Sequence, residues 1–320
     1  MRDLRGLSAR YGRRLLLMAA IAAAAIGGLG RLTVADAAGG QTAGEADARR
    51  VLRGAIEIHL HVDPLSYGAD IGTLRVARER GVRAVVVKNH FEPTVDLALL
   101  LGKELPGLEV FGGIDLNWIV GGLNLAIVEH MARTVGGRGG IVWMTTLDSE
   151  QAVRTAKWNR PFIVVSRGGD LVPEVEQIIS VLAEHDLVLA TGHVSPAEGL
   201  MMLREGQRQG VAHMVVTHAM DNPVFMSVPQ MQEAADLGAF IEFDFRYVLV
   251  SDGQVEAIRT VGPEHVILSE FWTNSDPLEY AGLSGVADFV EGMRRQGFTD
   301  PELDLMFKEN PARLLGLSAN

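Results

Sequence analysis

Short apolar runs rich in β-branched residues alternate with longer, helix-like segments from residue 55 onward. Runs of this length that are apolar at nearly every position are typical of strands buried on both faces. Strands that alternate with helices in this way predict a parallel sheet covered by helices. We predict eight strands: Ala55–His61, Ala84–His90, Val110–Asn117, Gly140–Thr146, Leu187–His193, His213–His218, Phe240–Phe245 and Val266–Glu270.

The segments between these strands are flanked in many places by turn-forming glycine or proline, as helices often are. Eight strands with intervening helices fit a closed (β/α)₈ barrel, the TIM-barrel class of α/β fold, which needs about 250 residues. Residues 150–170 fit neither rhythm, and we expect Pro161–Val165 to form an inserted hairpin or a small extra strand that could belong to a lid over the site. The clearest predicted helices are Ile71–Glu79, Leu123–Val135, Pro173–Glu184, Pro196–Gln207, Val228–Leu237 and Gly253–Val261.

A different pattern opens the chain. Arg13 and Arg14 precede the apolar run Leu15–Ile26, and the small-residue site Ala35–Ala37 follows, which is typical of a cleavable export signal. The arginine pair favours the twin-arginine type, with a general secretory signal or an uncleaved anchor as alternatives. We therefore expect an exported, periplasmic or extracellular protein with no stable membrane insertion after cleavage, because the apolar run is short for a transmembrane helix. The predicted parts are a signal at 1–37, a linker and lead-in at 38–54, and a single barrel domain at 55–320.

Composition narrows the partners and the metal chemistry. The 320 residues carry a formal charge of −11, and the first 37 contribute +4, so the remainder is more acidic still. This charge argues against nucleic acid as a partner and leaves a small-molecule substrate, with a homo-oligomer possible. The chain has no cysteine, so a metal would be held by imidazole, carboxylate or carboxylated lysine.

Histidines collect at the predicted carboxyl ends of strands, where (β/α)₈ barrels build their active sites. His59 and His61 are two residues apart on one strand and should face the same side as a chelating pair. His193 and His218 each end a later apolar strand. Since neutral imidazole is a common metal ligand, these four residues predict a divalent metal centre.

The second strand ends in Lys88-Asn89-His90, which places Lys88 and His90 on one face. His90 is a candidate ligand or acid/base group. Lys88 is a candidate substrate anchor or, if carboxylated, a bridge between two metals, and we assign both residues to catalysis. The alternative is a structural ion pair with Glu92 or Asp96.

Several other polar residues are as compatible with structural roles as with substrate contact. Asp115 and Asn117 end the third strand, Glu242 and Asp244 share a face of the seventh, and Trp143 could wall the pocket. The other four histidines lie inside or before predicted elements, and we expect none of them to bind the metal: His130, His185, His213 and His265.

Over residues 55–317 the chain resembles the amidohydrolase superfamily. The resemblance rests on His59-Leu60-His61, the strand-end His193 and His218, and the closing segment Glu309–Leu317. It implies a (β/α)₈ barrel with one or two divalent ions, Zn²⁺ foremost, that activate water against a C–N or C–O bond of a cyclic amide, lactone, ester or similar compound. An uncharacterised amidohydrolase-like branch of unknown function is resembled more closely, through Lys88-Asn89-His90, Phe111-Gly112-Gly113, Gly121-Gly122-Leu123-Asn124 and Thr191-Gly192-His193.

Two positions depart from the pattern that this resemblance implies. The superfamily usually carries an aspartate at the end of the eighth strand, where this chain has Ser269-Glu270-Phe271. We assign Glu270 as metal ligand and catalytic base, with Asp276 as the fallback. At the fourth strand the usual Lys or Glu is missing, which leaves Asp148 as a candidate ligand and Lys88 as a candidate bridge between two metals.

Two other functions remain compatible with the sequence. A phosphoesterase of the histidinol-phosphatase type also opens with His-x-His, although this chain has few strand-end carboxylates for three metals. A non-catalytic periplasmic binding protein on a degenerate barrel is favoured by the irregular eighth strand. A decarboxylase or hydratase on the same barrel is also open, because metal ligands do not fix the reaction.

Overall fold

The computed structural model describes residues 43–62, 69–135, 140–244, 251–269 and 283–318. The expected export signal at 1–37, Glu270 and Asp276 lie outside the described residues. Within the described ranges, no helix has both the length and the apolar character needed to cross a membrane.

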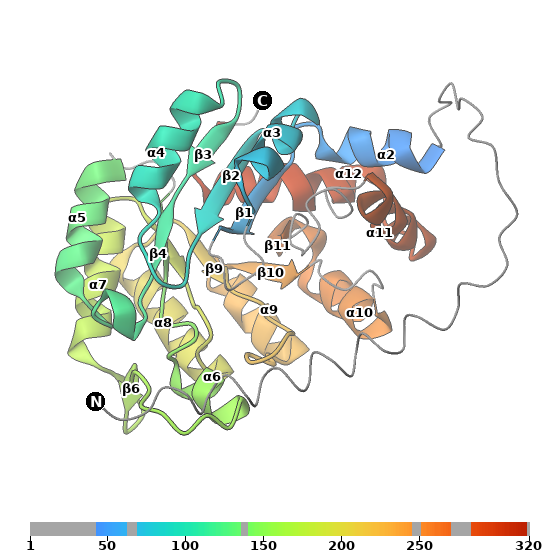
Figure 1. Ribbon diagram of the computed structural model, residues 1–320. Helices are drawn as coiled ribbons and strands as arrows, with labels where there is room; N and C mark the ends of the chain where they lie inside the picture. The colour runs from blue at the N-terminus through green and yellow to red at the C-terminus, as the bar shows by residue number, and fades with distance from the viewer. Residues whose placement is uncertain (1–42, 63–68, 136–139, 245–250, 270–282, 319–320) are drawn as a thin grey trace, which may run out of the picture. The chain divides into compact units, whose positions relative to one another are not determined.

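In the described part of the chain, nine short strands form the centre of the domain, and every neighbouring pair among them is parallel (Figure 1). One sheet has the order β1-β2-β3, and the other has the order β4-β5-β8-β9-β10-β11. β3 and β4 are separated only by Gly112, so together they occupy one of eight strand positions that follow chain order. The strands are β1 (Ile56–His61), β2 (Ala84–Lys88), β3 (Glu109–Phe111), β4 (Gly113–Asp115), β5 (Ile141–Trp143), β8 (Val188–Ala190), β9 (Met214–Val216), β10 (Phe240–Asp244) and β11 (Val266–Ser269).

This arrangement confirms the predicted (β/α)₈ fold, and a strand occupies each of the eight predicted positions. β1 and β11, the first and last strands, lie next to each other. No hydrogen-bonded ladder joins them within the described ranges, so the strands do not form a fully closed barrel there.

The break between β3 and β4 has a steric cause. A Cβ on Gly112 would lie 2.6 Å from the main-chain carbonyl of Thr94. A Cβ on Gly113 would lie 2.5 Å from the ring of Trp143, which fills the barrel interior. The two glycines therefore allow a helix-leading segment and a large aromatic ring to approach the strand from opposite sides.

Helices cover the outside of the strands (Figure 1). α4, α5, α7, α8, α9 and α10 pack against one another in succession, and α2 packs against α11. The helices are α2 (Ala43–Leu52), α3 (Ile71–Glu79), α4 (Val95–Glu104), α5 (Leu125–Val135), α6 (Glu150–Thr155), α7 (Pro173–Glu184), α8 (Pro196–Gln209), α9 (Val228–Asp236), α10 (Asp252–Val261), α11 (Leu283–Arg295), α12 (Asp300–Asp304) and α13 (Asn310–Leu314), with short turns η1 (Trp118–Val120), η2 (Pro263–His265) and η3 (Leu305–Glu309).

Two segments differ in detail from the sequence expectation. Much of the expected linker and lead-in is the helix α2, which buries Ala48, Val51 and Leu52 completely. Residues 161–165, expected to form a hairpin or a small extra strand, contribute an isolated parallel bridge between Ile163 and Ser149. The hairpin forms directly after them, where β6 (Ser166–Arg167) pairs with β7 (Asp170–Leu171) around Gly168 and Gly169. Both of these glycines have positive φ, which explains why the turn is placed there.

The core has two parts. The larger part lies between strands and helices, and the smaller part fills the barrel interior with side chains such as Ile56, Ile58 and Val86. Leu314 and Leu315 at the end of α13 pack against the interior group. Since apolar side chains fill the rest of the interior, the buried polar side chains gather at the carboxyl ends of the strands.

Candidate metal centre

His59 and His61 lie on the same side of β1, with ring centroids 5.0 Å apart. Alternation along the strand places both rings on one side, and a β-bulge before His61 turns that side toward the barrel interior. The register pairs Glu57 with Val85 and Leu60 with Val87, so two residues of β1 lie opposite one residue of β2. Because of this extra residue, Ile58 packs in the barrel interior and His59, directly after it, also points inward.

A glycine turn positions His193 after β8. Gly192 has a φ of 66°, and a Cβ there would lie 2.3 Å from the main-chain oxygen of Met144. Two threonines then join this turn to the end of β9. The amide of Gly192 donates to Thr217 Oγ1 at 3.2 Å, and the amide of Thr217 donates to Thr191 Oγ1 at 3.1 Å. These paired bonds fix the ends of the fifth and sixth strand positions relative to each other.

His218 directly follows Thr217 and has a φ of 48°. A left-handed backbone is uncommon for a residue with a side chain, and such residues cluster at functional sites. The ring of His218 lies with its centroid 4.6 Å from that of His59.

Five imidazoles form a continuous group, which we call the histidine cluster: His59, His61, His90, His193 and His218. Successive ring centroids lie 5.0, 4.8, 6.2, 5.4 and 4.6 Å apart around the group and back to His59. Each residue is at most 8% exposed. The four histidines that the sequence assigned to the metal are therefore brought together with His90, which it assigned to catalysis.

The donor set of this cluster fits a divalent metal. Nε2 of His193 is buried and has no hydrogen-bond partner among the described residues, an arrangement that calls for a ligand. Burial and the positive charge of Lys88 hold the pKa of His193 well below its usual value, so its imidazole is neutral, the form that binds metals. His59, His218 and Glu242 also offer ligand atoms that all lie within 4.8 Å of one another.

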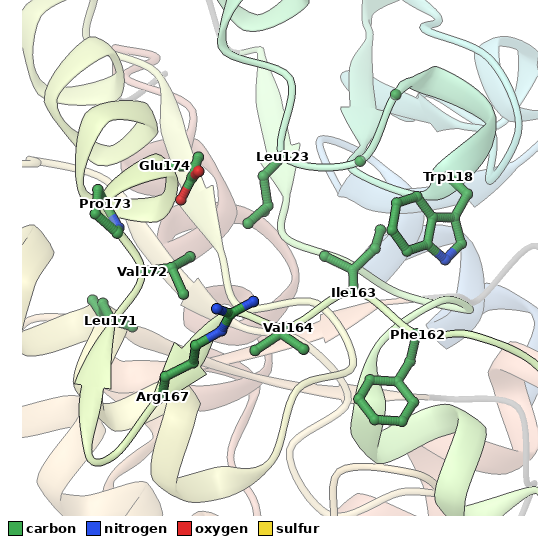
Figure 2. Close-up of a pocket in the computed structure, with 12 residues that line it drawn as sticks. Trp118, Leu123, Phe162, Ile163, Val164, Arg167, Leu171, Val172, Pro173 and Glu174 are labelled. Carbon is green, nitrogen blue, oxygen red and sulfur yellow. The ribbon is translucent and has the colours of Figure 1, made fainter.

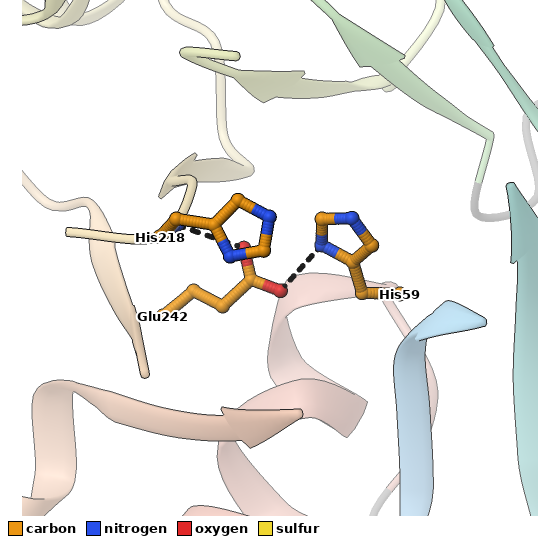
Figure 3. Close-up of side chains that lie close together, drawn as sticks. All are labelled: His59, His218 and Glu242. Atoms are coloured by element: carbon orange, nitrogen blue, oxygen red, sulfur yellow. Dashed lines mark hydrogen bonds and ion pairs between the residues drawn. The ribbon is translucent and has the colours of Figure 1, made fainter. Parts of the chain in front are cut away.

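Glu242 of β10 lies between two histidines of the cluster (Figure 3). Its Oε1 is 2.8 Å from Nδ1 of His59, and its Oε2 accepts a hydrogen bond from the amide of His218 at 3.3 Å. Ser269 of β11 donates its hydroxyl to the same Oε1 at 2.5 Å. Burial raises the pKa of Glu242 to about 7, against the lowering effects of the Ser269 hydrogen bond and the charge of Lys88.

A second polar network adjoins the cluster. Lys88 Nζ is completely buried, lies 3.1 Å from Asp115 Oδ2 and is 5.0 Å from the centroid of the Trp143 ring. The same Oδ2 accepts from Nδ1 of His90 at 2.6 Å and from the hydroxyl of Thr146 at 2.9 Å. Lys88 thus pairs with the third strand position rather than with Glu92 or Asp96.

The charge of Asp115 is stabilised by these contacts. Burial alone would raise the pKa of Asp115, but the Lys88 ammonium and the hydrogen bond from His90 hold it well below its usual range. An ionised Asp115 keeps a proton on Nδ1 of His90, so Nε2 is the ring nitrogen left to accept a proton or bind a metal.

The other candidates fall into two groups. Asn117 and Asp148 serve the framework: Asn117 donates to the main chain of His90, and Asp148 pairs with Arg160 and accepts from the amide of Trp118. Glu270 and Asp276 lie outside the described residues, so their assigned roles remain predictions. The sequence leaves Glu242 and Asp115 as compatible with structural roles as with substrate contact, and their places near the ends of predicted strands are the signal that points to the site.

A cavity of about 600 Å³ lies among the loops that follow β4 and α6, the hairpin and the start of α7 (Figure 2). Trp118, Leu123, Ile163 and Val172 give it apolar walls, and Arg167 adds a positive charge. Among the described residues that line it, none is a histidine of the cluster.

The fold is that of amidohydrolase-type barrels. An amidohydrolase from Pseudomonas aeruginosa is 13% identical with a TM-score of 0.54, and the match covers 85% of this chain and 99% of that chain. An organophosphorus hydrolase from Deinococcus radiodurans is 15% identical (TM-score 0.50; 84% and 94% covered). A 2,6-dihydroxybenzoate decarboxylase from Rhizobium is 10% identical (TM-score 0.52; 82% and 99% covered). The resemblance to the amidohydrolase superfamily is thus confirmed at the level of the fold.

The chain belongs to a family of unknown function (DUF6282), which matches residues 54–242. This range contains all five residues of the histidine cluster and ends at Glu242. No curated protein matches the chain.

Proposed function

We propose that this protein is a metal-dependent hydrolase that acts on a C–N or C–O bond of a small molecule, such as a cyclic amide, lactone or ester. The observation that carries the proposal is the convergence of five buried imidazoles at the carboxyl ends of the strands. In (β/α)₈ enzymes this end holds the active site. Support also comes from the fold that the chain shares with an amidohydrolase and an organophosphorus hydrolase.

His59, His61, His193 and His218 would hold the ion, with zinc the first choice because its sites commonly consist of imidazole nitrogens. A bound divalent ion would supply Lewis acidity and activate water for attack. Lys88 contributes a fixed, buried positive charge beside the cluster, suited to stabilising negative charge that develops on a substrate. His90, held by Asp115 through Nδ1, presents Nε2 for proton transfer.

The test compares zinc-loaded and chelated protein on a panel of lactones, esters and cyclic amides. Zinc-loaded wild-type protein should turn over at least one class, and chelation or His193→Ala should abolish that turnover. His130→Ala is the matched control, since His130 is exposed on α5 and outside the cluster. Phosphate monoesters in the same panel test a phosphoesterase, and turnover of these compounds alone would contradict the proposal. Metal binding without any turnover would instead indicate a binding protein.

A decarboxylase is the second candidate, because a 2,6-dihydroxybenzoate decarboxylase shares the fold to the same degree as the hydrolases. The buried Lys88 is a possible counter-charge for a substrate carboxylate. Release of CO₂ from aromatic carboxylates, without hydrolysis in the panel, would favour this function.

A further inference from the structure

We propose that Glu242 is a positioning residue of the metal centre, which holds the ring of His59 for metal binding, and that Ser269 in turn orients Glu242. This inference rests on the metal centre proposed above. It assigns a role to a carboxylate of the seventh strand position, where the sequence had placed the important acid on the eighth.

The contacts of Glu242 join three strands. Its Oε1 is 2.8 Å from Nδ1 of His59 on β1, and its Oε2 accepts from the amide of His218 beyond β9 at 3.3 Å. Glu242 is 1% exposed and His59 is fully buried, so both groups are fixed by packing as well as by these bonds. The other ring nitrogen of His59 points away from Glu242 (Figure 3).

Ser269 is the last described residue of β11, the strand expected to deliver an acid. Its side chain is buried and donates to Oε1 of Glu242 at 2.5 Å. The ladder between β10 and β11 pairs Asp244 with Ser269, so this hydroxyl reaches back along the sheet to Glu242. The eighth strand position thus contributes a hydrogen-bond donor to the carboxylate of the seventh.

A carboxylate that accepts from one imidazole nitrogen determines which nitrogen carries the proton, fixes the ring orientation and makes the other nitrogen a stronger ligand. His59 receives all three effects from Glu242. Loss of such a partner typically weakens metal affinity by about 10- to 100-fold. Glu242 also accepts a hydrogen bond from the main-chain amide of His218, but only its contact with the His59 ring bears on a ligand nitrogen.

The experiment measures zinc affinity by competition with a chromophoric chelator, together with the melting temperature of the metal-free protein. Glu242→Gln should weaken zinc binding about 10- to 100-fold. Its metal-free melting temperature should not fall, because the amide has the same shape and removes a buried carboxylate. Ser269→Ala should weaken binding by a smaller factor. Glu57→Gln is the matched control, because Glu57 is as buried as Glu242 but accepts a hydrogen bond from the main-chain amide of His59 and not from its ring. The zinc affinity of this variant should remain at the wild-type value.

Wild-type affinity in Glu242→Gln would overturn the inference, as would equal weakening by Glu57→Gln. A lower metal-free melting temperature with unchanged affinity would also overturn it, by reducing Glu242 to a structural residue. If Glu242→Gln does not fold, Ser269→Ala decides, and wild-type affinity there overturns the inference. His193→Ala separates the two proposals. If His193→Ala loses zinc while Glu242→Gln binds it with wild-type affinity, the metal centre stands and only the role of Glu242 is wrong. If His193→Ala keeps wild-type affinity, the proposed metal centre itself is wrong.

Discussion

At the scale of single residues, the site is a set of buried charges whose partners determine their state. Lys88 and Asp115 neutralise each other, and Asp115 also fixes the ring of His90. Glu242 instead contacts an imidazole and a hydroxyl, and its pKa rises to about 7. The two carboxylates therefore have opposite pKa shifts, although both are buried.

The Lys88–Asp115 pair gives a stability prediction. Asp115→Asn or Lys88→Met should each lower the free energy of unfolding by about 3–5 kcal/mol, because each leaves an uncompensated buried charge. The double variant should lose much less than the sum of the two, since it leaves neither charge behind. Urea unfolding of the four metal-free proteins measures this coupling. Additive losses would show that the pair is not the source of the stability.

Glu242 gives a pH prediction for the metal-free protein. Its pKa is raised from 4.5 to about 7 in the folded state, so between these values the folded state binds the proton more tightly than the unfolded state. The free energy of unfolding should therefore fall as pH rises through this range, by on the order of 3 kcal/mol from this residue. Glu242→Gln should lack this component. An identical pH dependence of urea unfolding in both proteins would refute the assignment.

At the scale of elements, the sequence was sufficient to place the eight strand positions and the clearest helices. Most strand positions are short apolar runs followed by polar residues, and this pattern can be recognised in the sequence without knowing which residues are in contact. The bulge in β1 could not be read in this way, because it depends on the pairing of Glu57 and Leu60 with β2. The partner of Lys88 could not be predicted either, because Asp115 lies on a different strand and the two side chains meet only in the assembled sheet. α4 is not among the clearest predicted helices, because Leu97, Leu99 and Leu100 are exposed and its sequence therefore has no clear amphipathic stripe.

The turn at Gly192 gives a prediction at this scale. Gly192→Ala should destabilise the metal-free protein by several kcal/mol, because it combines a left-handed backbone with a Cβ that would lie 2.3 Å from a main-chain oxygen. Gly168→Ala is the matched control, because Gly168 also has a left-handed backbone, with a φ of 63°, but nothing lies within 4 Å of the added Cβ. It should cost only about 1–2 kcal/mol. Equal shifts in thermal unfolding would show that backbone conformation alone explains both glycines.

At the scale of the whole molecule, the fold and the chemistry are separable. Hydrolases and a decarboxylase share this barrel at 10–15% identity, so the reaction depends on the side chains at the strand ends. The histidine cluster draws on strand positions one, two, five and six, so it is assembled only when most of the barrel has folded. We expect an ion to be acquired by the folded domain.

Export of a folded, metal-loaded protein is the role proposed for the first 37 residues. Replacing Arg13 and Arg14 together by lysine should block export if the signal is of the twin-arginine type, because that pathway reads the arginine pair itself. Cell fractionation with antibody detection measures the distribution. A general secretory signal would tolerate the change, since lysine retains the positive charge.

Metal binding by imidazoles of the cluster underlies every role proposed above, and X-ray absorption at the zinc edge of the reconstituted protein measures it. Zinc should remain bound after desalting, with several imidazole nitrogens as ligands at about 2.0–2.1 Å. The His193→Ala variant should show fewer imidazole ligands or lose the ion. Loss of zinc on desalting, or a set of ligands without imidazole, would show that the histidine cluster is not a metal site.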